Sequence, residues 1–234
     1  MSKIKKIFIS ISLLLGILSG GFFQNHSITH FNYANAQDSS DKETYSYLLD
    51  TIKDYDKAIR LNPKNAYAYF WRGDAKYELE RFEEAIKDYD KFIKLKPKHT
   101  DAYAHRGGAK LRLKQYKEAE KDFNKAIKNI KFIEYNKSFS DRLIKLDQKS
   151  KYSNGYFMRG WAKYRLQQYE TSIKDLNKAI SLSISISNND MLYYIRGLAK
   201  KAIGQDKEAK KDFDKARKLN SKIDKLMDHF INQF

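Results

Sequence analysis

Cysteine is absent from the 234-residue sequence, and proline occurs only twice. Without cysteine the chain cannot form disulfides or thiolate metal sites, and it has no cysteine nucleophile. The lipid-attachment cysteine of a bacterial lipoprotein is excluded for the same reason. The function therefore has to come from other residue types.

Motifs for catalysis are also missing. The five histidines are scattered, and three of them, His99, His105 and His229, follow residue 36 without acidic partners at metal-ligand spacing. The sequence has no serine elbow, no phosphate-cradling glycine loop and no paired-carboxylate motif beyond ordinary acids of helix surfaces. We therefore expect no enzyme activity, no cofactor and no metal.

Hydrophobic residues make up 41% of the chain, which is enough for a packed core and argues against wholesale disorder. The formal charge of +17 is high. Such a surplus draws a protein toward anionic polymers, lipid headgroups or an acidic partner.

Residues 1–36 have the layout of a secretory signal. A lysine-rich start, 1–6, precedes the uncharged stretch Ile7–Phe23, and Ala34 and Ala36 supply the small residues of a cleavage site. We expect cleavage after Ala36 and export to the periplasm, the cell envelope or the extracellular space. The alternative is an uncleaved membrane anchor, for which the apolar stretch is at the short limit.

Four Arg-Gly pairs divide the rest of the chain. Their glycines are Gly73, Gly107, Gly160 and Gly197, with separations of 34, 53 and 37 residues. Four residues before each stands Tyr69, Tyr103, Tyr156 or Tyr193. The residue twelve positions after each glycine is Ala85, Ala119, Ser172 or Ala209. The residue sixteen positions after each glycine is Tyr89, Phe123, Leu176 or Phe213. A fixed period of this length indicates a solenoid.

Each unit contains two predicted helices, because its apolar residues recur at helical spacing on both sides of a short break such as 79–81. A glycine inside a helix costs about 1 kcal/mol relative to alanine. We therefore expect each glycine to face the small residue twelve positions later, which would let the two helices approach closely.

This pattern of tyrosine, glycine, alanine, aromatic and alanine, ending at Pro63 or Pro97, resembles the tetratricopeptide repeat (TPR). The resemblance covers 66–99, 100–133, 153–186 and 190–223, with an N-terminal half-repeat or cap at 37–63. It implies an all-α fold, a right-handed superhelical solenoid of antiparallel helix pairs with about four full repeats. Phe92 and Ser172 depart from the small residues of the pattern.

The ends and the insert complete the predicted organisation. We expect the N-terminal half-repeat to form a helix over about 41–62, and 222–234 to form a C-terminal capping helix because of its apolar stripe. A membrane-surface helix is the alternative for 222–234. A helical insert at 134–152 either carries a partner contact or changes the curvature of the solenoid.

The recurring charges predict ion pairs. Arg72, Lys76 and Asp88 have counterparts in all the other repeats. A residue found in every copy favours a role in stacking the copies. The tripeptide Arg72-Gly73-Asp74 is then part of a helix, which argues against the cell-adhesion motif that the three letters suggest.

The resemblance also implies a binding site, because in tetratricopeptide proteins the first helices line a concave groove for a peptide. The groove positions are Tyr67, Phe70, Asp74, Tyr77, Leu111, Arg112, Phe157, Trp161, Tyr164, Arg165, Tyr194, Leu198 and Lys201. The Lys/Asn carboxylate clamp of the family is missing, since Phe70, Asp74, Ala104 and Gly108 stand at its positions. We therefore expect an apolar or aromatic-bearing ligand, with Trp161 as the anchor.

Taken together, the sequence predicts an exported, non-catalytic protein–protein interaction scaffold that binds a protein or peptide in an aromatic-lined groove. The alternative is a basic adaptor that binds anionic envelope polymers or lipid headgroups. Nucleic acid is not an expected partner of an exported protein, and a membrane is expected only through an uncleaved signal segment.

Overall fold

The computed structural model describes residues 39–129, 139–184 and 189–233. The predicted signal segment and the first part of the predicted insert lie outside these residues. Every regular element of the described residues is an α-helix, so the all-α prediction is confirmed. The chain divides into two compact units, one reaching Asn129 and the other ending at Phe230.

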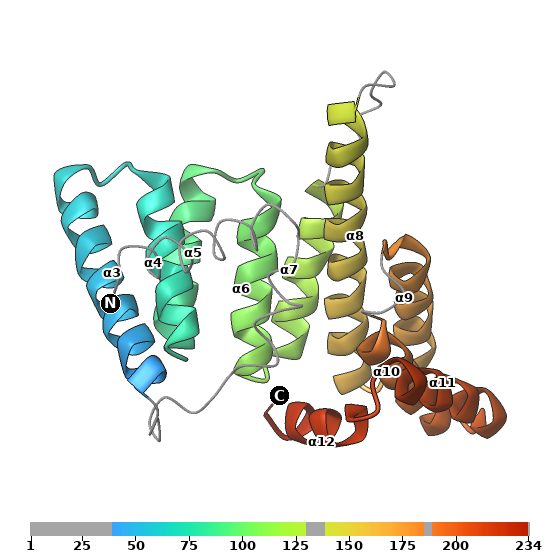
Figure 1. The fold of residues 1–234 in the computed structure, drawn as a ribbon. Helices are drawn as coiled ribbons and strands as arrows, with labels where there is room; N and C mark the ends of the chain where they lie inside the picture. The colour runs from blue at the N-terminus through green and yellow to red at the C-terminus, as the bar shows by residue number, and fades with distance from the viewer. Residues whose placement is uncertain (1–38, 130–138, 185–188, 234) are drawn as a thin grey trace. The chain divides into compact units, whose positions relative to one another are not determined.

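The first unit consists of α3 (Ser39–Leu61), α4 (Ala66–Glu78), α5 (Phe82–Leu95), α6 (Thr100–Arg112) and α7 (Tyr116–Asn129). The second contains α8 (Phe139–Arg165), α9 (Tyr169–Leu182), α10 (Asp190–Ala202) and α11 (Asp206–Leu219), followed by α12 (Ile223–Gln233) (Figure 1). The predicted helix pairs are present as α4–α5, α6–α7, α8–α9 and α10–α11. Successive repeats are joined where α3 packs on α4, α5 on α6, and α9 on α10.

The turn inside each repeat uses a left-handed residue at the same repeat position. Glu80, Lys114 and Gln167 have φ values of 58°, 58° and 60°, and Gly204 has a φ of 77°. A left-handed residue ends the first helix and starts the reversal into the second. Only the fourth copy uses glycine, the residue that adopts this conformation without steric cost.

The repeated glycines pack against the residue sixteen positions later. A Cβ atom at Gly73 would lie 2.9 Å from Cε1 of Tyr89, and one at Gly107 would lie 2.8 Å from Cε1 of Phe123. The expectation named the small residue twelve positions later, whereas the side chain nearest to each glycine is the ring or leucine sixteen positions later. In the third repeat, Ser172 Oγ donates a hydrogen bond of 2.7 Å to the carbonyl oxygen of Gly160, so the serine is accommodated in a buried position.

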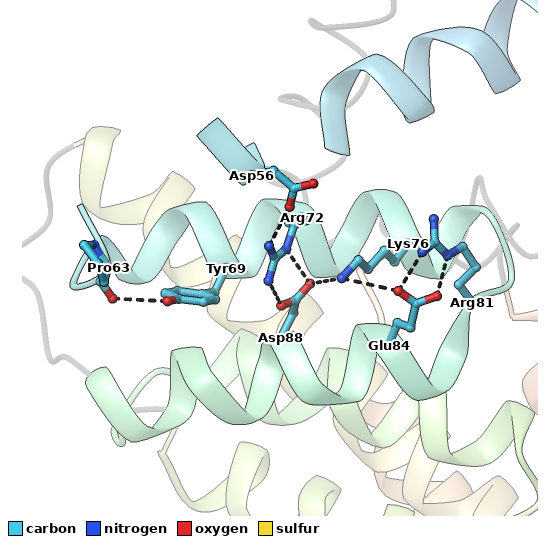
Figure 2. A network of polar contacts seen from close by, with 8 residues as sticks. All are labelled: Asp56, Pro63, Tyr69, Arg72, Lys76, Arg81, Glu84 and Asp88. Carbon is cyan, nitrogen blue, oxygen red and sulfur yellow. Dashed lines mark hydrogen bonds and ion pairs between the residues drawn. The ribbon is translucent and has the colours of Figure 1, made fainter. Parts of the chain in front are cut away.

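The expected ion pairs are confirmed (Figure 2). Arg72 on α4 donates through Nε and Nη2 to the buried carboxylate of Asp88 on α5, and Lys76 Nζ lies 2.8 Å from the same carboxylate. Arg72 Nη1 also donates to Asp56 on α3 at 2.6 Å. One arginine thus links the two helices of its own repeat to the second helix of the preceding one.

The other repeats keep this arrangement. The buried carboxylates of Asp122, Asp175 and Asp212 each pair with the arginine and the lysine of the same repeat. The link to the preceding repeat recurs as Arg106 Nη1 with Asp90 and as Arg196 Nη1 with Asn177. The ion pairs therefore belong to the repeat framework.

The other departure from the repeat pattern and the insert are both accommodated within the helices. Phe92, which replaces a small residue, is fully buried, with its ring centroid 5.0 Å from Phe70 and 4.9 Å from His99. The described part of the insert is continuous with the third repeat, because α8 runs without a break from Phe139 to Arg165.

Candidate functional site

The predicted groove residues of the first unit are mostly buried. Phe70, Asp74 and Tyr77 on α4 are each less than 10% exposed, whereas Tyr67 is 45% exposed. On α6, Leu111 is fully buried and Arg112 is half-buried. Whether they line a groove for a partner stays a prediction.

Arg112 joins neighbouring repeats at the end of α6. Its Nη2 donates a hydrogen bond of 2.7 Å to Glu80 in the turn between α4 and α5, and its guanidinium lies 4.7 Å from the ring centroid of Phe82. Cation–π contacts of this kind contribute about 0.5–1 kcal/mol. Arg112 therefore has a packing role within the first unit.

A buried polar cluster surrounds Asp74. Asp74 Oδ1 accepts a hydrogen bond of 2.7 Å from the hydroxyl of Tyr89, and Nδ1 of His105 lies 2.7 Å from the same oxygen. Asp74 is 3% exposed and His105 is 7% exposed. The contact joins α4 to α6 in the next repeat, so this carboxylate–imidazole pair connects two first helices.

Sequence reasoning missed this pair because its members are 31 positions apart. A signal was nevertheless present. Asp74 directly follows the repeat glycine, where the other copies have Gly108, Trp161 and Leu198. A charged residue found at this position in only one copy cannot belong to the common framework. Its presence indicates that Asp74 makes a contact that the other copies lack.

The cluster shifts the titration of its members. Burial, together with the nearby Asp74 carboxylate, raises the pKa of Glu78 to about 7, against the opposing effects of His105 and Arg112. Burial lowers the pKa of His105, but the Asp74 carboxylate outweighs burial and the resulting pKa is raised. Asp74 Oδ2 is buried without a hydrogen-bond partner among the described residues, while Oδ1 connects α4 to α5 and α6, which favours a structural link over a catalytic centre. No group of three potential metal ligands occurs among the described residues.

The predicted residues of the second unit share one side of α8 and α10. Phe157, Trp161 and Tyr164 follow one another at steps of four and three residues on α8, as Tyr194, Leu198 and Lys201 do on α10. We call this side, with those six residues, the first-helix face of the second unit. Trp161 is fully buried, Lys201 is exposed, and the other four are half-buried.

Trp161 is the centre of an aromatic stack. Its ring lies 5.4 Å from that of Tyr164 at an interplanar angle of 14°, and the guanidinium of the half-buried Arg165 lies 5.4 Å from the Trp161 ring. Phe230 of α12 lies 5.2 Å from the Trp161 ring. The predicted anchor is therefore already in contact with an aromatic residue of the chain itself.

The lysines of α5, of the segment after it and of α7 form an exposed basic surface. It comprises Lys87, Lys91, Lys94, Lys98, Lys117, Lys121, Lys125 and Lys128. Two of these lie over tyrosine rings of the framework, Lys91 at 5.9 Å from Tyr69 and Lys125 at 5.4 Å from Tyr103. The others leave positive charge available at the surface of the first unit.

Among the helices of the described residues, none combines the length and the apolar character required to cross a bilayer.

Comparisons with known proteins agree with the repeat architecture. Models described as tetratricopeptide repeat match residues 72–132, 153–183 and 192–223, and one described as TPR repeat matches 50–79. A crystal structure of MamA is 22% identical, with a TM-score of 0.61, and the alignment covers 81% of this chain and 99% of that one.

A second structure, MamA 41-end from Desulfovibrio magneticus RS-1, is 19% identical with a TM-score of 0.59, over 80% of this chain and 98% of that one. Comparison of the sequence with curated proteins gives no significant match. The repeat matches, the paired helices and the structural likeness lead to one conclusion: the chain is a tetratricopeptide repeat protein.

Proposed function

We propose that this protein is a non-catalytic interaction scaffold that binds a protein or peptide partner on the first-helix face of the second unit. The tetratricopeptide family consists of protein-interaction scaffolds, which supports the general role. Binding to a preformed helical framework requires little ordering of the scaffold, so more of the interaction energy appears as affinity.

The observation that carries this proposal is the combination of aromatic and cationic side chains on that face. Phe157, Tyr164 and Tyr194 are half-buried, so each presents part of its ring at the surface, and Lys201 is exposed. Partly exposed aromatic residues near a cation are typical of the energetically important centres of interfaces. They suit a partner with apolar side chains and an acidic residue.

The experiment is a crosslinked capture from envelope extract with matched variants of the full chain. Phe157→Ala/Leu198→Ala changes two half-buried residues of the face and leaves the buried Trp161 in place. Lys174→Ala/Lys211→Ala changes two exposed residues of the second helices α9 and α11 and serves as the control. Both variants are first compared with the wild type by circular dichroism.

The proposal predicts one dominant protein captured by the wild type and by the lysine variant but lost with Phe157→Ala/Leu198→Ala. Identical capture by all three chains would contradict it. Binding through the face should persist at a few hundred millimolar salt, because apolar contacts are not screened.

The second candidate function is that of a basic adaptor for anionic envelope polymers or lipid headgroups. The exposed lysines of α5, α7 and the segment after α5 favour it. Charge-driven binding should be lost at a few hundred millimolar salt, so a salt titration of the captured material separates the two functions.

Export is part of the proposal and has its own test. The layout of residues 1–36 motivates it. Mass spectrometry of the protein recovered from a secreting bacterial host should give a chain that begins at Gln37. Recovery of the intact chain in the membrane fraction would instead support an uncleaved anchor.

A further inference from the structure

The C-terminal helix α12 does not continue the regular stacking of the repeats. Elsewhere the second helix of a repeat packs closely along the first helix of the next one, as α5 does on α6 and α9 on α10. By its place in the sequence, α12 would be the next first helix. No such close backbone packing joins α12 to α11, or to any other helix of the described residues, so α12 is held through side chains.

Side chains of α12 contact two residues of the first-helix face. At its start, Asp224 pairs with Arg217 of α11 at 2.9 Å, and burial together with the neighbouring Asp224 carboxylate raises the pKa of Tyr194 on α10. Further along α12, Phe230 contacts Trp161 on α8. Two residues of the predicted binding face, one on each first helix, thus have neighbours on α12.

The apolar side of α12 is buried. Ile223 and Met227 are fully buried and Phe230 is 8% exposed, and their spacing of four and three residues places them on one side of the helix. Lys225 and Asp228 on the other side are exposed. A short amphipathic helix seated on a helical surface is the geometry of helix-in-groove recognition.

Trp161 also has an unsatisfied donor. Trp161 Nε1 is buried and has no hydrogen-bond acceptor among the described residues. A buried donor without an acceptor costs about 1–3 kcal/mol. A different helix that brings an acceptor to this point would bind better than α12 does, so an exchange of occupants is energetically reasonable.

We propose that α12 occupies, within the same chain, the site on the first-helix face to which an amphipathic helix of the partner binds. This proposal rests on the proposed function, whose binding face it uses. The partner helix carries large apolar residues at positions i, i+4 and i+7, as α12 does with Ile223, Met227 and Phe230. It binds after α12 has left the face.

The test uses the full chain in a Trp71→Phe background, which leaves Trp161 as the only tryptophan. Met227→Lys places a charge on the buried side of α12, and Phe230→Ala removes the contact with Trp161 more mildly. Lys225→Ala, on the exposed side, is the matched control. The probes are acrylamide quenching of Trp161 fluorescence and a labelled synthetic peptide of residues 221–234.

We expect stronger quenching of Trp161 in the two buried-side variants than in the wild type or in Lys225→Ala. We also expect the peptide to bind these two variants at least tenfold more tightly than the wild type, because a tethered segment competes at an effective concentration near millimolar. A control peptide carrying Met227→Lys and Phe230→Ala should not bind.

Two results would overturn the proposal. One is that both buried-side variants lose more helix than the residues of α12 account for. The rest of the fold would then depend on α12, which would make α12 a permanent part of it. The other is a folded variant with unchanged Trp161 quenching or no peptide binding.

The capture experiment keeps this test separate from the proposed function. If Phe157→Ala/Leu198→Ala loses the partner but Met227→Lys does not increase capture, the binding face stands and the role of α12 fails. If neither variant changes the capture, the proposed function itself fails.

Discussion

Asp88→Asn tests whether the repeated carboxylates hold the repeats together. Asp88 is 3% exposed and accepts from Arg72 Nε at 2.9 Å, from Arg72 Nη2, and from Lys76 Nζ at 2.8 Å. The substitution keeps the shape of the side chain but removes its charge. Two cations with largely buried side chains then lie beside a neutral amide.

Removing one partner of a buried ion pair costs about 3–5 kcal/mol. Part of this cost is avoided here, because Arg72 retains Asp56 at 2.6 Å and Lys76 retains Glu84 at 3.7 Å. We therefore expect a loss of about 2–3 kcal/mol in the free energy of unfolding. The assay is urea-induced unfolding followed by far-ultraviolet circular dichroism.

The matched control is Asp90→Asn, which removes the charge of an ion-pair partner of Arg106 that is 55% exposed. Arg106 keeps the buried Asp122, so the loss should be only about 0.2–1 kcal/mol, as for an exposed pair. Equal losses for the two variants would refute the reasoning, because burial would then not decide the contribution of a carboxylate.

Three further predictions concern single positions. Gly107→Ala should lower the free energy of unfolding by about 1–3 kcal/mol, because its Cβ would lie 2.8 Å from a rigid ring. Gly160→Ala should be near neutral, because its Cβ would lie 3.1 Å from the flexible Leu176 side chain. Urea unfolding of both variants measures the difference. Lys114→Gly should stabilise by about 0.5–1 kcal/mol, seen as a higher urea midpoint, because it relieves a φ of 58°. The pKa of Glu78 is about 7 in the folded protein and near 4.5 when unfolded, so the free energy of unfolding falls as pH rises between these values. Glu78→Gln should therefore stabilise at pH 8 by on the order of 2 kcal/mol but not at pH 4, measured by urea unfolding at both pH values.

The framework could be predicted from the sequence because its residues recur. The period, the helix pairs and the ion pairs depend on residues present in every copy, and the structure contains all three. The side chain that lies nearest to each glycine was not predicted. Periodicity shows that two positions share a face, but it does not show which of two side chains, Ala85 or Tyr89, lies closer to Gly73.

Contacts between residues that occur only once could not be predicted in this way. Asp74 and His105 are 31 positions apart and lie in different repeats, so no local pattern pairs them. The apolar stripe of α12 gave a helix but not its location, because the same stripe can cap the last repeat or cross earlier helices. The contact of Phe230 with Trp161 brings α12 to α8, while Asp224 pairs with Arg217 of the last repeat.

One position of the repeat brings these observations together. The residue after the repeat glycine differs in every copy: Asp74, Gly108, Trp161 and Leu198. Asp74 contacts the next repeat through His105, and Trp161 contacts α12. The preceding Arg-Gly pair forms the ion pairs and allows the close helix approach in all four copies. The next position can therefore vary without disturbing the stacking of the repeats. In two of the four copies this position links a first helix to another element, α4 to α6 through Asp74 and α8 to α12 through Trp161.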